Sequence, residues 1–440
     1  MVAGGEDVPA RLERLPASAW HLRVRWLIGA VTFFEGFDQL AIAYTLPSLS
    51  AEWGLSGGQQ ALAITSGSVG MLLGALVSGV LADRVGRVNV VVISLAVTAL
   101  SCVGLAISPG YVSFVALRFV QGLGIGGEVP AAATYIGELA QSEQRGRFVL
   151  LYELVFPAGL TAVAVVAAWV VPALGWRWVY GIGVLPALLV GPILRWVPES
   201  PRWLAASGRG ERAMGVMERI ERAVQRSTGR PLPPVVAITR APSVRRRYLR
   251  RTVIVGLLWL LSYFANYGIA TWLPTIYTSA FDLPVSTALA YSVATSVAGL
   301  IGAVAVALLV DRIGRRACLA GGSALAAVTF GVLALLGANS ALELLVLSAV
   351  GALFVFGVNL GLYLYAPELY PTPMRAAGAS LGGVWNRLGV IAGPLVVGAF
   401  AAGLGLPSAF LVLGVAMLAA AVTAFLSEET RGRTLEEISP

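Results

Sequence analysis

The chain has 440 residues, of which 57% are hydrophobic and 12% are charged. A soluble globular protein of this composition would expose large apolar patches to water, so the composition excludes that class and indicates a membrane protein. The net charge of +8 comes entirely from arginine, and a charge of this sign is also found in proteins that bind nucleic acids.

Twelve apolar segments have the length of a helix that crosses a lipid bilayer, which needs about 20 residues. Six of them precede a long polar segment and six follow it. We therefore predict an all-α integral membrane protein built from two pseudo-symmetric six-helix bundles. The predicted spans are, in chain order, 24–47, 61–82, 88–107, 112–139, 148–172, 178–197, 252–277, 288–310, 317–337, 342–366, 376–402 and 407–426.

The polar segments divide the chain into five predicted regions. They are a cytoplasmic N-terminal segment 1–23, an N-terminal bundle 24–197, an Arg-rich cytoplasmic linker 198–251, a C-terminal bundle 252–426 and a cytoplasmic tail 427–440. This division follows from the apolar spans and from the distribution of arginine described next.

Arginine is distributed very unevenly over the predicted loops. Thirteen of the 31 arginines fall in the linker, whereas Arg177 alone falls in a predicted outer loop. Because cytoplasmic loops of membrane proteins carry an excess of basic residues, we predict that both termini face the cytoplasm of a cell-membrane protein. The same distribution argues against a nucleic-acid partner. Contact with lipid headgroups is an alternative role for the linker arginines.

A charged pattern occurs twice in the sequence. The loop Asp83-Arg84-Val85-Gly86-Arg87 returns 228 residues later as Asp311-Arg312-Ile313-Gly314-Arg315. The pair Glu138 and Arg145 returns 230 residues later as Glu368 and Arg375, and Glu199-Ser200-Pro201-Arg202 has a weaker echo in Glu429-Thr430-Arg431-Gly432. Paired halves of this kind are typical of membrane carriers that rock about a central site.

We predict that these repeated charges gate the movement of the bundles, while the alternative is that short basic loops only set the topology. The predicted gating residues of this pattern are Asp83, Arg84, Gly86, Arg87, Glu138, Arg145, Glu199, Arg202, Asp311, Arg312, Gly314, Arg315, Glu368 and Arg375.

Four stretches carry more specific motifs: Gly79 to Arg87 (G-V-L-A-D-R-V-G-R), Arg118 to Gly127, Pro198 to Leu204 and Glu429 to Glu437. Together they resemble the major facilitator superfamily along nearly the whole chain. The P-E-S-P-R and E-T-x-G-R-T pieces are similar to sugar porters and their organic-ion and niacin-transporter relatives. The segment Glu35-Gly36-Phe37-Asp38 resembles aromatic-acid:proton symporters, which usually carry Asp where this chain has Glu35.

The resemblance implies a transporter and not an enzyme, with a small organic solute, protons and the lipid bilayer as its partners. It also implies a monomer driven by the proton gradient, without a cofactor. The two cysteines, Cys102 and Cys318, make no metal-ligand cluster in the sequence. We expect symport of an organic anion such as an aromatic or pyridine carboxylate. A sugar or organic-cation carrier, by symport or uniport, is the alternative, and a non-transporting membrane sensor is a third.

Charges within the predicted spans need a reason, because an ionised side chain at the bilayer centre costs at least about 2.5 kcal/mol. Asp38 and Arg118 are expected at similar depths, roughly 14 and 9 Å from the outer ends of their helices. In the families that this chain resembles, an acid at the Asp38 position carries the coupling proton and a basic residue at the Arg118 position modulates it. Glu35, one turn away, is a second proton site or part of the binding pocket. A static salt bridge is the alternative.

Arg387 is expected roughly 16 Å deep in the eleventh span. A guanidinium binds a carboxylate through two parallel hydrogen bonds, so we predict that Arg387 anchors a substrate carboxylate. The alternative is a pair with Asp38 or Glu35 from the other bundle. The other predicted binding residues offer ring faces or amide groups to a small planar ligand, and they are Gln39, Trp259, Tyr263, Asn266, Tyr267 and Asn386.

Glu128 and Glu153 are the remaining acids inside predicted spans. We place both near the cytoplasmic ends of their helices and assign them to the gating network. If they face the central cavity instead, the number of acidic groups favours a cationic substrate.

Overall fold

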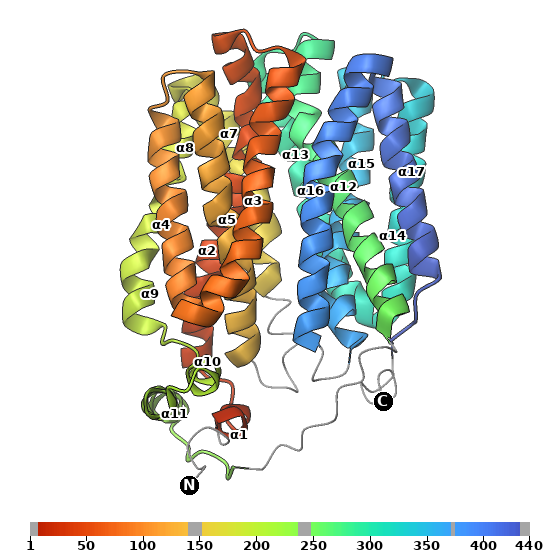
Figure 1. Cartoon of the computed structure of the whole chain (residues 1–440). Coiled ribbons are helices and arrows are strands. Elements are labelled where there is room, and N and C mark those ends of the chain that lie inside the picture. The colour runs from red at the N-terminus through yellow and green to blue at the C-terminus, as the bar shows by residue number, and fades with distance from the viewer. Residues whose placement is uncertain (1–7, 140–151, 236–247, 371–374, 432–440) are drawn as a thin grey trace.

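The computed structural model describes residues 8–139, 152–235, 248–370 and 375–431. Regular structure in these ranges is helical throughout, and twelve spans within them are long and apolar enough to cross a membrane. Figure 1 shows these spans as two bundles standing side by side. The predicted all-α membrane fold is therefore confirmed.

The first bundle contains the first six spans. They are α2 (Ala19–Trp53), α3 (Gly57–Val85), α4 (Arg87–Ala106), α5 (Tyr111–Leu139), α7 (Val155–Leu174) and a broken sixth span made of α8 (Arg177–Ile182), the 3-10 turn η1 (Leu185–Leu189) and α9 (Val190–Trp196). The break has a local cause, because Pro186 in η1 has no N–H to donate to the preceding turn.

The second bundle contains the last six spans. They are α12 (Leu249–Ala280), α13 (Val285–Ile313), α14 (Arg315–Leu336), α15 (Ala341–Glu368), α16 (Arg375–Leu404) and α17 (Leu406–Phe425). Each predicted span overlaps one of these twelve. The ends of several helices extend a few residues farther than predicted, because α-helices continue into the polar boundary where hydropathy no longer reports them.

Three short helices lie beneath the first bundle: α1 (Val8–Glu13), α10 (Pro201–Ala206) and α11 (Gly210–Thr228) (Figure 1). We call this side of the molecule the linker end and the opposite side the far end. Helix α11 is amphipathic and buries an apolar face that includes Val216, Met217 and Ile220. Its Glu221 accepts hydrogen bonds from two arginines that belong to the N-terminal segment, Arg11 at 2.6 and 2.9 Å and Arg14 at 2.7 Å.

Two apolar cores show how the bundles are joined. The larger core runs through both bundles and includes Tyr44 of α2 and Leu289 of α13. The smaller core lies in the linker-end half of the first bundle and continues into α1, α10 and α11 instead of the second bundle. At this end the first bundle therefore packs on its own linker helices.

Hydrogen bonds also cross between the bundles. The hydroxyls of Tyr44 and Ser296 lie 3.0 Å apart, and Thr161 donates to the main-chain oxygen of Ser296 at 3.3 Å. The helix pairs that meet across the interface include α2 with α12, α3 with α16 and α7 with α13. These bonds and the shared core therefore join the two bundles through their interior.

Candidate functional site

Asp38 lies in the middle of the first bundle with a side chain that is only 1% exposed. Its Oδ1 receives a long contact from the thiol of Cys102 at 3.8 Å, and Oδ2 has no hydrogen-bond partner among the described residues. Gly183, at the break in the sixth span, leaves room for the carboxyl group, because a Cβ there would overlap Oδ1. The broken span thus makes space for a buried acid.

Arg118 lies beside Asp38, as the depths estimated from the sequence suggested. Its Nη1 donates to Gln121 Oε1 at 2.5 Å and to the main-chain oxygen of Asp38 at 3.5 Å. Gly67 of α3 provides the space for the guanidinium, since a Cβ at that position would lie 2.8 Å from Nη2. Arg118 is therefore held against the Asp38 main chain by its neighbours, while the Asp38 carboxylate stays available.

Arg387 of α16 crosses to the first bundle. Its Nη2 lies 3.4 Å from Glu35 Oε1, and its Nη1 contacts Met71 Sδ at 3.7 Å. The side chains of Arg387 and Glu35 are 9% and 4% exposed. The pair with Glu35, which the sequence left open as an alternative, is the arrangement that the structure adopts.

Glu128 and Glu153 require a correction. The sequence predicts both near the helix ends with the gating residues. In the structure Glu128 lies deep in α5 and Glu153 lies just before the start of α7, and both act electrostatically with Glu35. Glu128 is 3% exposed, contacts Glu35 and interacts electrostatically with Arg387 and Glu153. Glu128 is about 16 Å from Leu139, the linker-end residue of α5, which is too deep for the loops. We call Glu35, Glu128, Glu153 and Arg387 the central cluster.

Aromatic side chains of the second bundle form a wall next to this cluster. The rings of Tyr263 and Tyr267 stack with centroids 6.0 Å apart. Trp259 lies 5.4 Å from Tyr263 and 4.6 Å from Tyr363, whose hydroxyl accepts from Tyr263 at 3.3 Å. Arg387 and Glu153 act electrostatically on Tyr263 and Tyr363, so wall and cluster belong to one site.

A small cavity of about 10 Å³ lies between the bundles next to this site, which is room for a single water. Two predicted binding residues line it, Gln39 and Tyr267, and the polar atoms of both side chains have no hydrogen-bond partner among the described residues. Asn266 and Asn386 are buried and directly precede Tyr267 and Arg387 in the sequence, but they do not line this cavity. An aromatic ligand needs far more space, so the bundles must move apart for it to bind.

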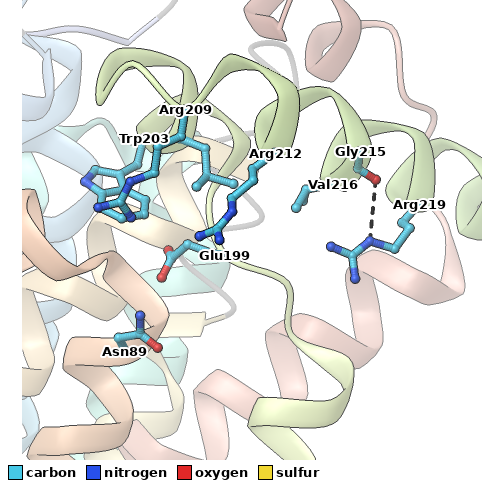
Figure 2. Close-up of a pocket in the computed structure, with 9 residues that line it drawn as sticks. Asn89, Glu199, Trp203, Arg209, Arg212, Gly215, Val216 and Arg219 are labelled. Atoms are coloured by element: carbon cyan, nitrogen blue, oxygen red, sulfur yellow. Dashed lines mark hydrogen bonds between the residues drawn. The ribbon is translucent and has the colours of Figure 1, made fainter.

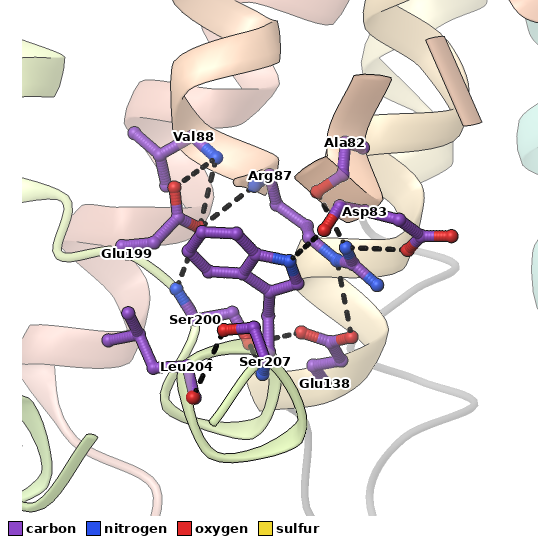
Figure 3. Close-up of polar contacts among 10 residues, drawn as sticks. Ala82, Asp83, Arg87, Val88, Glu138, Glu199, Ser200, Leu204 and Ser207 are labelled. Atoms are coloured by element: carbon purple, nitrogen blue, oxygen red, sulfur yellow. Dashed lines mark hydrogen bonds and ion pairs between the residues drawn. The ribbon is translucent and has the colours of Figure 1, made fainter. Parts of the chain in front are cut away.

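The repeated charges form two networks at the linker end. In the first, Arg87 pairs with Asp83 at 2.9 Å and with Glu138 at 3.7 Å, and Ser200 donates to Glu138 (Figure 3). Glu199 accepts from the main-chain N–H groups of Arg87 at 2.9 Å and Ser200 at 2.8 Å. Because Arg87 begins α4, Glu199 places a negative charge at a helix N-terminus, where it is stabilising. We call these five residues the N-terminal network.

The second network repeats this geometry in the second bundle. Arg315 pairs with Asp311 at 2.8 Å and with Glu368 at 3.0 Å, and Thr430 donates to Glu368. Glu429 accepts from the main-chain N–H groups of Arg315 at 3.0 Å and Thr430 at 2.9 Å, and so caps the N-terminus of α14. We call these residues the C-terminal network. The repeat of Glu199-Ser200 as Glu429-Thr430 is weak in sequence, but the two segments make the same contacts in the structure.

The two networks share further details. Gly86 and Gly314 have φ values of 112° and 104°, which favour glycine, and a Cβ at either position would contact the capping carboxylate. The Tyr135 hydroxyl donates to the main-chain oxygen of Pro198 at 2.6 Å. At the equivalent position of the second bundle, the Tyr365 hydroxyl donates to the main-chain oxygen of Glu428 at 2.7 Å. Both networks hold parts of a single bundle together.

The remaining predicted gating residues have different positions. Arg84 and Arg312 are exposed in the last turns of α3 and α13, and Arg202 is half-buried in α10. Arg145 and the side chain of Arg375 lie outside the described residues.

A larger pocket of about 430 Å³ lies at the linker end between α4 and α11 (Figure 2). Arg209, Arg212 and Arg219 line it, and the Arg209 guanidinium lies 4.8 Å from the centre of the Trp203 ring. Since its walls belong to the first bundle and the linker, this pocket is separate from the interface that would carry a solute.

Several residues of the site are not predicted by the sequence. Gly67 and Gly183 matter through the space they leave, and Met71, Thr271 and Tyr363 are ordinary residues of apolar helices. The one available signal was the Gly-x-Gly pair beside a proline at 181–186, which indicates a broken helix.

Comparison with known proteins shows the family and the fold of the chain. The family model described as "Sugar (and other) transporter" matches residues 25–440. The niacin transporter of Acinetobacter baylyi is 34% identical over 98% of this chain and 99% of its own length. The gallate transporter of Pseudomonas putida is 28% identical over 98% of this chain and 97% of its own.

Solved structures show the same fold. The proton:xylose symporter XylE superposes with a TM-score of 0.73 at 21% identity, covering 96% of this chain and 98% of that chain. An inward open structure of the xylose transporter from E. coli gives a TM-score of 0.71 at 22% identity, covering 95% and 99%. Fold and relatives are those of multi-pass membrane transporters of small solutes and not of enzymes. The chain therefore belongs to the sugar (and other) transporter family of the major facilitator superfamily.

Proposed function

We propose that this protein is a secondary active transporter that moves an organic anion, an aromatic or pyridine carboxylate, together with protons. The observation that carries the proposal is the pair of Arg387 and Glu35 across the two bundles. Glu35 occupies the guanidinium in the way that a substrate carboxylate would. A carboxylate that replaces Glu35 on Arg387 exchanges one charged partner for another, which keeps the cost of leaving a buried guanidinium unpaired low.

The aromatic wall and the relatives support the class of cargo. Tyr263 and Tyr267 offer stacked ring faces close to Arg387, which suits a flat ring that carries a carboxylate. Niacin is a pyridine carboxylate and gallate is a benzoate, and relatives named for both align along nearly the whole chain.

The proton is assigned to Asp38. Its Oδ2 is buried without a hydrogen-bond partner among the described residues, and Arg118 lies beside it. A change in the distance between Arg118 and the carboxyl group during rocking would change the affinity of Asp38 for a proton. The proposal includes a monomer in the cell membrane with both termini in the cytoplasm, using the proton gradient and no cofactor.

The test is uptake into proteoliposomes with labelled nicotinate, gallate, xylose and a small organic cation. An inward proton gradient should stimulate uptake of the two carboxylates. The Asp38→Asn variant should show a clearly weaker stimulation of uptake by the proton gradient, while exchange of internal for external carboxylate continues. Uptake of neither carboxylate would refute the anion proposal, and unchanged uptake by Asp38→Asn would remove Asp38 from the coupling role.

A second candidate is transport of an organic cation. The specific observation in its favour is that Glu128 and Glu153 join Glu35 at the interface, so that acidic groups outnumber the single guanidinium of the central cluster. Uptake of the cation, with no uptake of either carboxylate, would establish this alternative.

A further inference from the structure

Glu128 is the least satisfied charged group of the central cluster. Its side chain is 3% exposed, and both carboxyl oxygens have no hydrogen-bond partner among the described residues. Glu35 Oε2 also has no hydrogen-bond partner among the described residues, although Glu35 Oε1 contacts Arg387. Buried polar atoms in proteins almost always have partners, so these three oxygens require an explanation.

The two carboxyl groups lie next to each other. Glu128 lies within hydrogen-bonding reach of Glu35, but two ionised carboxylates have no hydrogen to donate. A single proton between them converts the contact into a strong hydrogen bond and satisfies an oxygen on each side. Without it, the cluster would bury three negative charges against one guanidinium.

We propose that Glu35 and Glu128 share one proton and form a second proton-binding site, controlled by Arg387. The inference rests on the proposed transport of carboxylates and adds the residues that bind a further proton. It assigns to Glu128 a role in proton binding in place of gating, and it explains how an acidic interface accepts an anion.

The charges balance through the cycle. With Arg387 on Glu35, one proton lies between Glu35 and Glu128, and Glu35 keeps its negative charge. When a substrate carboxylate takes Arg387, Glu35 loses its counter-charge and binds a second proton from water. One carboxylate and one proton are therefore bound together. On release of the substrate, Arg387 returns to Glu35 and that proton leaves.

Other ionisable groups act on this pair from the surrounding elements. They are Arg387, Glu153, and the phenols of Tyr152, Tyr263 and Tyr267, and the phenol of Tyr363 acts in turn on Glu153 and Arg387. Phenols ordinarily ionise near pH 10, so measurements between about pH 5.5 and 8.5 report mainly on carboxyl groups.

The experiment measures the Kd of nicotinate across this pH range by calorimetry, in wild type and three variants. Where one proton binds with the carboxylate, Kd rises about tenfold per pH unit. We expect this dependence in wild type and in Asp38→Asn, because the proton in question is not on Asp38. Glu35→Gln should bind nicotinate with a Kd that no longer changes with pH. Glu128→Gln should shift the midpoint of the dependence to higher pH, because an amide N–H stabilises ionised Glu35 less than the shared proton does.

Calorimetry in buffers of different ionisation enthalpy gives a second readout, the number of protons taken up per carboxylate bound. Asp38→Asn should still take up one proton. The control variant is Glu52→Gln, which removes an acid paired with Arg177 at the far end and should match wild type.

The outcomes separate this inference from the proposed function. Loss of the pH dependence in Asp38→Asn, or wild-type behaviour of Glu128→Gln, overturns the shared proton while carboxylate transport stands. Failure of wild type to bind any carboxylate overturns both.

Discussion

The charged networks at the linker end differ from the central cluster in how well their groups are satisfied. Glu199 and Glu429 each accept several main-chain hydrogen bonds at the start of a helix, and their arginine partners are paired within the same bundle. In the central cluster, Glu128 has no hydrogen-bond partner among the described residues, and the one ion pair joins different bundles. Satisfied charges hold each bundle together as one body, whereas incompletely satisfied charges between the bundles are the ones that can exchange partners.

This contrast refines the gating prediction. The sequence suggested that the repeated loops clasp helices in one state and release them in the other. The structure places each network inside one bundle, so both networks can stay intact when the bundles tilt. Their release during transport remains a prediction.

The largest effect is expected from Arg387, the charge shared between bundles. Arg387→Ala should weaken binding of nicotinate by at least about 100-fold, close to 3 kcal/mol, because the carboxylate loses its only cationic partner in the central cluster. Binding of the neutral amide nicotinamide should change little. Calorimetry with both ligands measures this, and Arg177→Ala at the far end is the control. An equal loss for acid and amide would show that Arg387 is structural.

Gly183 tests the space around the coupling acid. Gly183→Ala should reduce gradient-driven uptake about tenfold or more, because the added Cβ overlaps Asp38 Oδ1 and displaces the carboxyl group. The matched control is Gly191→Ala in the same span, where a Cβ meets nothing within 4 Å. Similar uptake by the two variants would mean that the position of the Asp38 carboxyl group is not critical.

The networks should affect stability more than coupling. Glu199→Ala and Glu429→Ala each leave main-chain N–H groups at a helix start without an acceptor, which should cost about 1–3 kcal/mol of unfolding free energy. Thermal unfolding in detergent should show a lower Tm for both. The pH dependence of nicotinate binding should match wild type in both variants. A changed dependence would link the networks to the central cluster and weaken the contrast drawn above.

The smallest expected effect is on the pH dependence of the stability that Glu429 contributes. Burial opposes ionisation of Glu429, but hydrogen bonds from the N–H groups of Arg431, Arg315, Arg316 and Thr430 outweigh it and lower its pKa. Stabilisation by Glu429 is therefore present above the unfolded-state pKa near 4.5 and is lost as pH falls through the lower folded-state pKa. The Tm difference between wild type and Glu429→Gln should be constant from pH 6 to 8 and shrink below about pH 4.5. A difference that varies between pH 6 and 8 would contradict this.

Much of the site could be predicted as a set of residues but not as a set of contacts. Asp38, Arg118 and Arg387 stand out because ionisable residues in apolar spans are rare and costly. The structural contribution of Gly67 or Met71 depends on which helix packs against them, and a single sequence does not contain that information. Glu128 shows the same limit, because the sequence predicts it in the gating network near a helix end, whereas it lies against Glu35.

The sequence by itself determined the twelve spans, the duplication and the identity of the buried charges, since length, hydropathy and the cost of charge in lipid are properties of local segments. Only the tertiary structure decided that Arg387 pairs with Glu35, that Glu128 and Glu153 join them, and that the two networks each close within one bundle. The rise of a helix gives the depth of a residue, but the direction in which its side chain points relative to other helices is set by how the helices pack.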